Sequence, residues 1–360
     1  MCAASTIFWH SQHTFPYCTP PGALSTSSGI DSTIDESKLS DSDLPGSNNM
    51  PSEAQDMLSA LDFTTTDHET YKFASSGRCN HDVDVDLIEA AATAGDLEAV
   101  RCLMDYIKRS GGAQRATLLS GSALMFAVDY GRKEVVEYLL SEGLTVHTTH
   151  VKVATINKDA AVLELLFTHG WDINTPIEWC VPPALAFAVE DPALVDWFLA
   201  NGADPNARCL LDITPLSAAV EFASLPTIQR LVDQGGSVAC GQLMHYALRR
   251  KSDDRIQVME FLLRQPSLPP TRKLMYEDEP WWFESQKFFG LGTPLHDAAT
   301  GGDLDAVRFL IAKGSGPTIK DSLGKLAIEK AHKHGHDSVV LYLRALPYQS
   351  TSSPTAEPHL

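Results

Sequence analysis

Three histidines near the C-terminal end have residue types that could bind a metal ion. His332, His334 and His336 lie close together, and Asp337 follows the last of them. Because they alternate along the chain, they would face different sides of a helix and its turn, and no Cys or Glu stands nearby at a zinc-ligand spacing. We therefore interpret them as a polar capping face and predict no metal site.

One histidine could act as a general base. His296 follows the tripeptide Thr-Pro-Leu at 293–295, but no Ser or Cys on a sharp turn supplies a nucleophile for it. The sequence has no phosphate-binding loop of the GxxxxGK type, and its seven cysteines never form a CxxC pair. These patterns predict that the protein is not an enzyme, holds no cofactor and takes no small-molecule substrate.

The charge balance restricts the class of partner. The 360 residues include 46 acidic and 28 basic ones, for a formal net charge of -18. A surface that binds nucleic acid needs clustered Lys and Arg, so we predict no direct nucleic-acid partner. No stretch approaches the ~18 apolar residues of a membrane span, and the N-terminus lacks the pattern of a signal peptide. We expect no membrane partner and a cytoplasmic or nuclear location.

The first 86 residues have a different texture from the rest. They are dominated by Ser, Thr, Pro and Asp, a composition that buries too little apolar surface to offset its conformational entropy. We predict a disordered acidic arm over 1–86 and a disordered tail over 346–360. Within the arm, residues 53–63 (EAQDMLSALDF) place Met57, Leu58, Leu61 and Phe63 near one helical face, as in an acidic activation segment.

From Leu87 onward a short helical pattern recurs. Its clearest copy is TPLHDAATGGDLDAVRFLIAKG, from Thr293 to Gly314. Most copies follow one another at close to ~33 residues, and one long interval between Ala247 and Ala298 marks an insertion. An alanine that closes the first element of each copy can be placed at Ala91, Ala127, Ala154, Ala188, Ala219, Ala247, Ala298 and Ala331.

The sequence TPL at 293–295 and 214–216, together with NGADPN at 201–206, resembles the ankyrin repeat family over about 87–343. The resemblance implies an all-α, ankyrin-like solenoid of about eight helix pairs with hairpin-like turn tips. It also implies a structural hydrogen bond from His296 and a concave groove that binds proteins. We predict a repeat domain over 87–345 with an insertion at 266–292.

Each landmark has a physical reason. Thr293 can cap a first helix, and Pro294 fits its first turn, where a missing N–H costs nothing. The small side chain of Ala298 lets neighbouring helices approach closely. Gly314 suits a helix end, and we interpret Gly111 and Gly112 as a linker between copies.

The insertion contains Trp and Phe residues in a loop far longer than a repeat connection needs, and aromatic anchors dominate binding hot spots. We predict Trp179, Arg208, Trp281 and Trp282 as partner-binding residues. For the insertion, the alternative is that Trp282, Phe283 and Phe288 fold back as a short helix and patch the groove. For Arg208, it is a solvated surface charge.

Two functions fit these patterns. The first is a non-catalytic adaptor that holds a partner protein in the concave groove. The second is a transcription coregulator of the pathway-specific kind found in fungi, which binds a transcription factor through the repeats and activates through residues 53–63. The chain has no basic DNA-binding helix in front of the repeats, so a coregulator would depend on its partner for DNA contact.

Overall fold

The computed structural model of the chain describes residues 83–346. The predicted arm up to residue 82, the segment 53–63 and the tail beyond residue 346 lie outside these residues, whereas residues 83–86, the last four of the predicted arm, begin helix α4. In chain order the elements are α4 Val83–Ala94, α5 Leu97–Asp129, α6 Lys133–Ser141, α7 Thr148–Ile156, α8 Ala160–Thr168, β1 Pro176–Glu178, β2 Val181–Pro183, α9 Leu185–Ala188, α10 Pro192–Ala200, α11 Pro215–Phe222, α12 Leu225–Asp233, α13 Leu243–Arg249, α14 Arg255–Leu263, α15 Pro280–Gln286, the 3₁₀ helix η3 Lys287–Phe289, α16 Pro294–Thr300, α17 Leu304–Ala312, α18 Ala327–Lys333 and α19 Asp337–Ala345.

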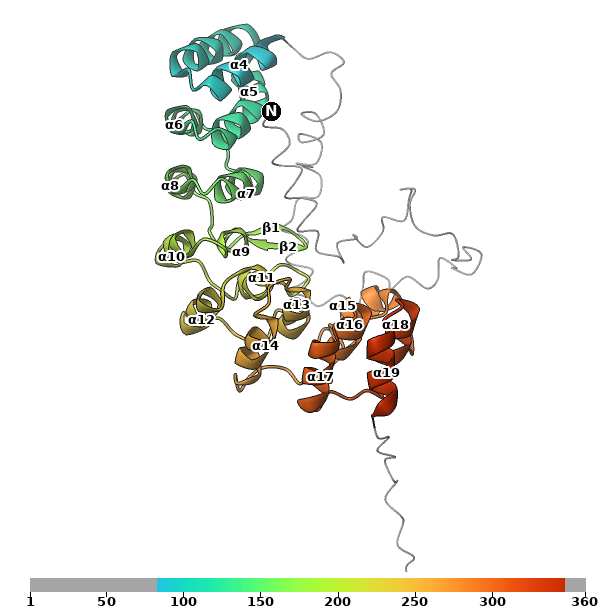
Figure 1. Cartoon of the computed structure of the whole chain (residues 1–360). Helices are drawn as coiled ribbons and strands as arrows, with labels where there is room; N and C mark the ends of the chain where they lie inside the picture. The colour runs from blue at the N-terminus through green and yellow to red at the C-terminus, as the bar shows by residue number, and fades with distance from the viewer. Residues whose placement is uncertain (1–82, 347–360) are drawn as a thin grey trace, which may run out of the picture.

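Within residues 83–346 the helices form eight pairs that stack into a curved row (Figure 1). The first helices of successive pairs contact one another along the inner side of the curve, as α11 contacts α13 and α16 contacts α18. The second helices lie on the outer side. This arrangement confirms the predicted all-α, ankyrin-like solenoid. No helix in the described part of the chain is long and apolar enough to cross a membrane.

The predicted alanines lie in the first helices, where small side chains let neighbouring pairs approach. Seven of the eight are buried, and Ala154, Ala219 and Ala331 are 0% exposed. Ala91 is only partly buried, whereas Ala92 beside it is 0% exposed. In the first copy, therefore, the spacing residue comes one position later than the pattern predicts.

Helix starts are stabilised by side chains that accept from free backbone N–H groups. Asp303 accepts from the N–H of Ala306 at 2.9 Å before α17, and Asp96 and Asp159 do the same before α5 and α8. At α16 the N–H of Thr293 donates to Nδ1 of His296 at 3.1 Å, while Nε2 of His296 donates to the carbonyl of Lys325 at 3.1 Å. The expected structural role of His296 is thus visible in its contacts.

One element differs from the sequence prediction, and one turn tip is more regular than a loop. Gly111 and Gly112, interpreted as a linker, lie within α5, a continuous helix of 33 residues that serves the first two pairs. A two-stranded antiparallel hairpin, β1 and β2, stands between α8 and α9, with Glu178 opposite Val181. The hairpin-like turn tip that the resemblance implies is therefore a true β hairpin at this position.

The histidine cluster belongs to the last pair. Nε2 of His336 donates to the carbonyl of Thr300 at 2.9 Å, which ties α19 to α16. The ring lies against Gly302, whose φ is +70°, and a Cβ there would approach within 2.4 Å of it. Among residues 83–346 no group of three or more His, Cys, Asp or Glu side chains is arranged to hold a metal ion.

Candidate partner-binding site

Three of the predicted residues form one aromatic cluster. Trp179 is at the two-residue turn of the β1–β2 hairpin, while Trp281 and Trp282 lie in α15, on the insertion. The rings of Trp179 and Trp282 stack with centroids 6.2 Å apart and an interplanar angle of 17°. Trp281 meets Trp282 edge to face at 4.3 Å. The insertion therefore folds back onto a tip that precedes it by three helix pairs.

Burial separates the roles within this cluster. Trp282 is only 6% exposed, so its side chain supports its neighbours and offers little surface to a partner. Trp179 and Trp281 are partly buried and keep surface available on either side of it. The alternative in which Trp282 and Phe283 fold back as a short helix matches α15. Phe288, by contrast, is 63% exposed in η3.

Arg208, the fourth predicted residue, lies in the adjacent tip and is not simply solvated. Its guanidinium donates to Oδ1 of Asp212 at 3.1 Å and contacts Oε1 of Glu279 at 3.5 Å. Glu279 immediately precedes α15, so this contact joins the tip to the insertion beside the tryptophans. The backbone strengthens the link, because the N–H of Leu210 donates to the carbonyl of Trp179 at 2.9 Å.

Asp212 organises the tip and was missed by the sequence analysis. It is 4% exposed, has a φ of +53°, and its Oδ2 accepts from the N–H of Gly241 at 2.9 Å and the amide of Gln242 at 3.1 Å. One carboxylate thereby connects two neighbouring tips. The available signal is its position two residues before Thr-Pro-Leu, because Asp tolerates this backbone region better than most residues.

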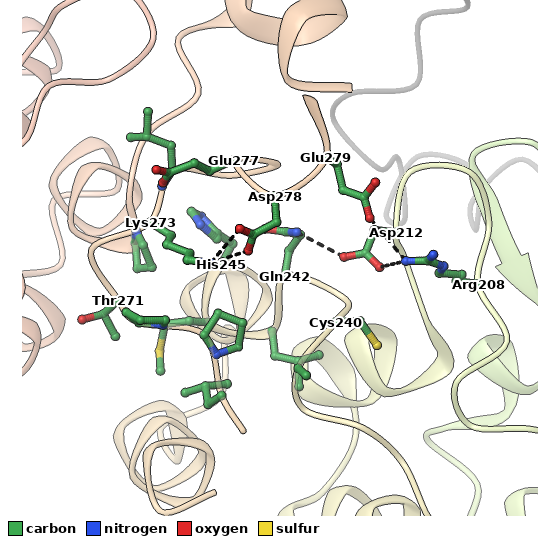
Figure 2. A pocket seen from close by; sticks show the side chains of 18 residues that line it. Arg208, Asp212, Cys240, Gln242, His245, Thr271, Lys273, Glu277, Asp278 and Glu279 are labelled. Carbon is green, nitrogen blue, oxygen red and sulfur yellow. Dashed lines mark hydrogen bonds and ion pairs between the residues drawn. The ribbon is translucent and has the colours of Figure 1, made fainter. Parts of the chain in front are cut away.

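A pocket of about 220 Å³ opens between these tips and the insertion (Figure 2). It is lined by Arg208, Asp212, Pro294 and residues from the segments 239–245, 268–274 and 277–279. Lys273 is held by Asp278, whose two oxygens lie 2.6 and 2.7 Å from Nζ. The carboxylate of Glu277 accepts from the N–H of Leu274 at 2.8 Å.

The pKa of one lining carboxyl is shifted. Burial raises the pKa of Glu279 above its usual range, and the neighbouring guanidinium of Arg208 opposes that shift only in part. A raised pKa means that the favourable interactions around the carboxylate do not fully offset the cost of removing its charge from water. Glu279, like Asp212, was not identified from the sequence, because no local pattern connects it with Arg208, 71 residues away.

The insertion is also fastened to the last tip. Oγ of Ser322 accepts from the N–H of Leu291 at 2.7 Å and donates to the carbonyl of Lys287 at 2.6 Å. Beside this contact, Phe288, Phe289 and Leu323 are each more than half exposed. The insertion is therefore a packed segment held on two sides, and its apolar surface is only partly covered.

The sequence comparisons identify these helix pairs. A family model described as ankyrin repeats in many copies matches residues 289–331, which include the α16–α17 pair and most of α18. Residues 289–331 of this chain therefore match the ankyrin repeat family. The ankyrin repeat is a protein-interaction module, since stacked repeats form an extended concave binding surface.

Individual relatives share only part of this ankyrin repeat chain. A 71-residue stretch is 37% identical to a probable E3 ubiquitin-protein ligase, XBOS33, of Oryza sativa subsp. japonica, and covers 20% of this chain and 14% of that protein. A 54-residue stretch is 43% identical to cyclin-dependent kinase inhibitor 2A of Monodelphis domestica and covers 15% of this chain and 32% of that protein. The chain thus spans less than half the length of either relative.

Among solved structures, the crystal structure of the ankyrin repeat domain of Bcl-3 is similar to 72% of this chain and 97% of its own. The sequence identity is 21% and the TM-score is 0.38.

Proposed function

We propose that this ankyrin repeat protein is a non-catalytic adaptor. Its partner protein would bind the inner face where the β1–β2 hairpin, the Arg208–Asp212 tip and α15 meet. We call this surface the tryptophan face and define it by Trp179, Arg208 and Trp281, with Trp282 beneath. The observation that supports it is the convergence of these residues from three segments distant in sequence.

The composition of the tryptophan face suits a binding hot spot. Trp and Arg are the residues most enriched at such positions, and anchors contribute most when a rigid neighbourhood holds them in place. Here the stack on Trp282 fixes both outer tryptophans, while Asp212 and Glu279 fix the guanidinium. A partner would therefore meet a preformed surface and lose little side-chain entropy on binding.

The test uses the full chain as bait, with quantitative identification of the proteins it captures. Trp281→Ala removes a partly exposed anchor, and we expect at least one partner to bind about thirtyfold more weakly, which corresponds to about 2 kcal/mol. Trp197→Ala is the matched control, because Trp197 is also partly buried but lies in α10, a second helix on the outer side. Equal capture by the native chain and Trp281→Ala would remove the tryptophan face from the function.

The second candidate function is a transcription coregulator that binds a transcription factor through the same surface. It requires that residues 53–63 activate transcription, and these residues lie outside those the structure describes. The adaptor proposal does not depend on them, so the two proposals are tested separately.

A further inference from the structure

The pocket beside the tryptophan face has an apolar floor. Leu243 and Met244 of α13 are almost fully buried on one side, and Pro269, Pro270 and Pro294 line the other. Its volume of about 220 Å³ is below the roughly 300–1,000 Å³ of pockets that hold drug-sized molecules. The pocket therefore suits one side chain of a bound protein better than a free metabolite.

The rim of the pocket has more anionic than cationic groups. Its lining includes four carboxylates (Asp212, Glu277, Asp278 and Glu279) and two cationic side chains (Arg208 and Lys273). The remaining titratable side chains that line it are Cys240 and His245. His245 points to Asp297 of α16, 2.8 Å away.

The contacts show which of the paired carboxylates has the weakest compensation. Glu277 has no ion pair among the described residues, but it is exposed to water and accepts from the N–H of Leu274, so the comparison lies among the other three carboxylates. Asp212 accepts hydrogen bonds from Arg208, Gly241 and Gln242, and Asp278 forms an ion pair with Lys273. Glu279 shares the guanidinium of Arg208 with Asp212 and contacts it at 3.5 Å, the longer of the two distances. One guanidinium thus faces two carboxylates, and Glu279 at the rim has capacity for a second cation.

We propose that this pocket receives the lysine or arginine side chain of a basic segment in the partner protein, with its charged end at Glu279. The apolar stem would lie along the leucine and proline floor, as long cationic side chains do when they cover apolar surface. The formal net charge of -18 would attract such a segment over a distance. The inference rests on the proposed function, since the same partner would contact the tryptophan face.

The first experiment selects peptides from a phage-displayed library of random sequences of about 12 residues, a length that covers a typical groove contact. The full chain is the target. We expect enriched peptides to share Lys or Arg at one position and to bind Glu279→Gln about tenfold more weakly, since truncating one partner of a close charge pair slows association or hastens release. Glu284→Gln is the matched control, because it removes the same charge from α15 outside the pocket lining.

The second experiment exchanges the charges. A selected peptide with its shared Lys changed to Glu should lose binding to the native chain and regain part of it with Glu279→Lys. Enriched peptides without a shared basic residue, or binding that is indifferent to Glu279→Gln, would overturn the inference. So would a failure of the charge exchange to restore any binding.

The outcomes separate this inference from the adaptor proposal. Peptides whose binding depends on Trp281 but on neither a basic residue nor Glu279 would support the tryptophan face as a binding surface. They would overturn the inference that the pocket receives a cationic side chain. Peptides that depend on both Trp281 and Glu279 support both. If no selected peptide depends on either residue, both proposals fail.

Discussion

Acidification is expected to destabilise the repeat stack through His150. This histidine is 3% exposed in α7, and its Nδ1 accepts from the N–H of His147 at 3.1 Å. Burial, with a smaller contribution from the neighbouring His147, lowers the pKa of His150 to about 3. The native stack therefore keeps the ring neutral at pH values where the unfolded chain protonates it.

The sign and size follow from proton linkage. The unfolded pKa is about 6.5, so between about pH 6.5 and about pH 3 the unfolded chain binds one proton that the native chain does not. The free energy of unfolding must fall as the pH falls through this window. Between about pH 7.5 and about pH 5 the loss from His150 is about 2 kcal/mol, and it is the same whether the native pKa is about 3 or about 4.

The assay is urea denaturation followed by circular dichroism at both pH values. His150→Asn keeps a side-chain acceptor for the N–H of His147 and removes the titration, so its change in the free energy of unfolding should be smaller by about 2 kcal/mol than that of the native chain. His169→Asn, at an exposed position after α8, is the control. If the native chain and His150→Asn lose stability in parallel, the ring is not kept neutral by burial and the reasoning is refuted.

Four further changes test the packing and the arm. Asp254→Asn should lower the free energy of unfolding in urea by about 3–5 kcal/mol, because it leaves the buried charge of Arg250 unpaired. Arg250 is 3% exposed, and its guanidinium donates to both carboxylate oxygens of Asp254 at 2.6 Å. Asp253→Asn, at the exposed neighbouring position, should change the free energy of unfolding little. Ala298→Leu should lower the free energy of unfolding by about 1–3 kcal/mol through overpacking between α16 and α18, and an unchanged denaturation midpoint would contradict the tight spacing. Trp282→Ala should cost about 3–5 kcal/mol and expose the insertion to limited proteolysis; cleavage no faster than in the native chain would mean that the stack does not hold it. Residues 50–70 fused to a neutral DNA-binding module should drive a reporter only if the coregulator proposal holds, with Leu58, Leu61 and Phe63 changed to Ala as the control.

The repeated part of the fold was predictable because its determinants are local. Each copy has its own helix start, apolar period and glycine end within ~33 residues, and the Thr293 and Thr214 starts appear in the structure as capping boxes. Helix α5 was not predictable in this way. Gly111 and Gly112 each disfavour a helix by about 1 kcal/mol, which indicates a break, but the backbone continues through them.

Residues for a candidate site could be selected from the sequence, but their arrangement could not be predicted. Trp179, Trp281, Trp282 and Arg208 were selected for their chemistry and their expected tip positions, and the structure places them together. Their stacking and the role of Glu279 depend on how the insertion folds back across the tips. That path is a tertiary property, because the strands of the hairpin are only three residues long and no period extends across the insertion.

The stack between Trp179 and Trp282 has a mechanical consequence. In a solenoid each repeat touches only its neighbours, so the array can stretch and unwind one unit at a time, like a spring. Here α15 connects the tip before α9 with the segment before α16 and spans the pairs between them. Pulling on the two ends should therefore stretch the first pairs independently, while the pairs from α9 to α14 yield together in a single larger step.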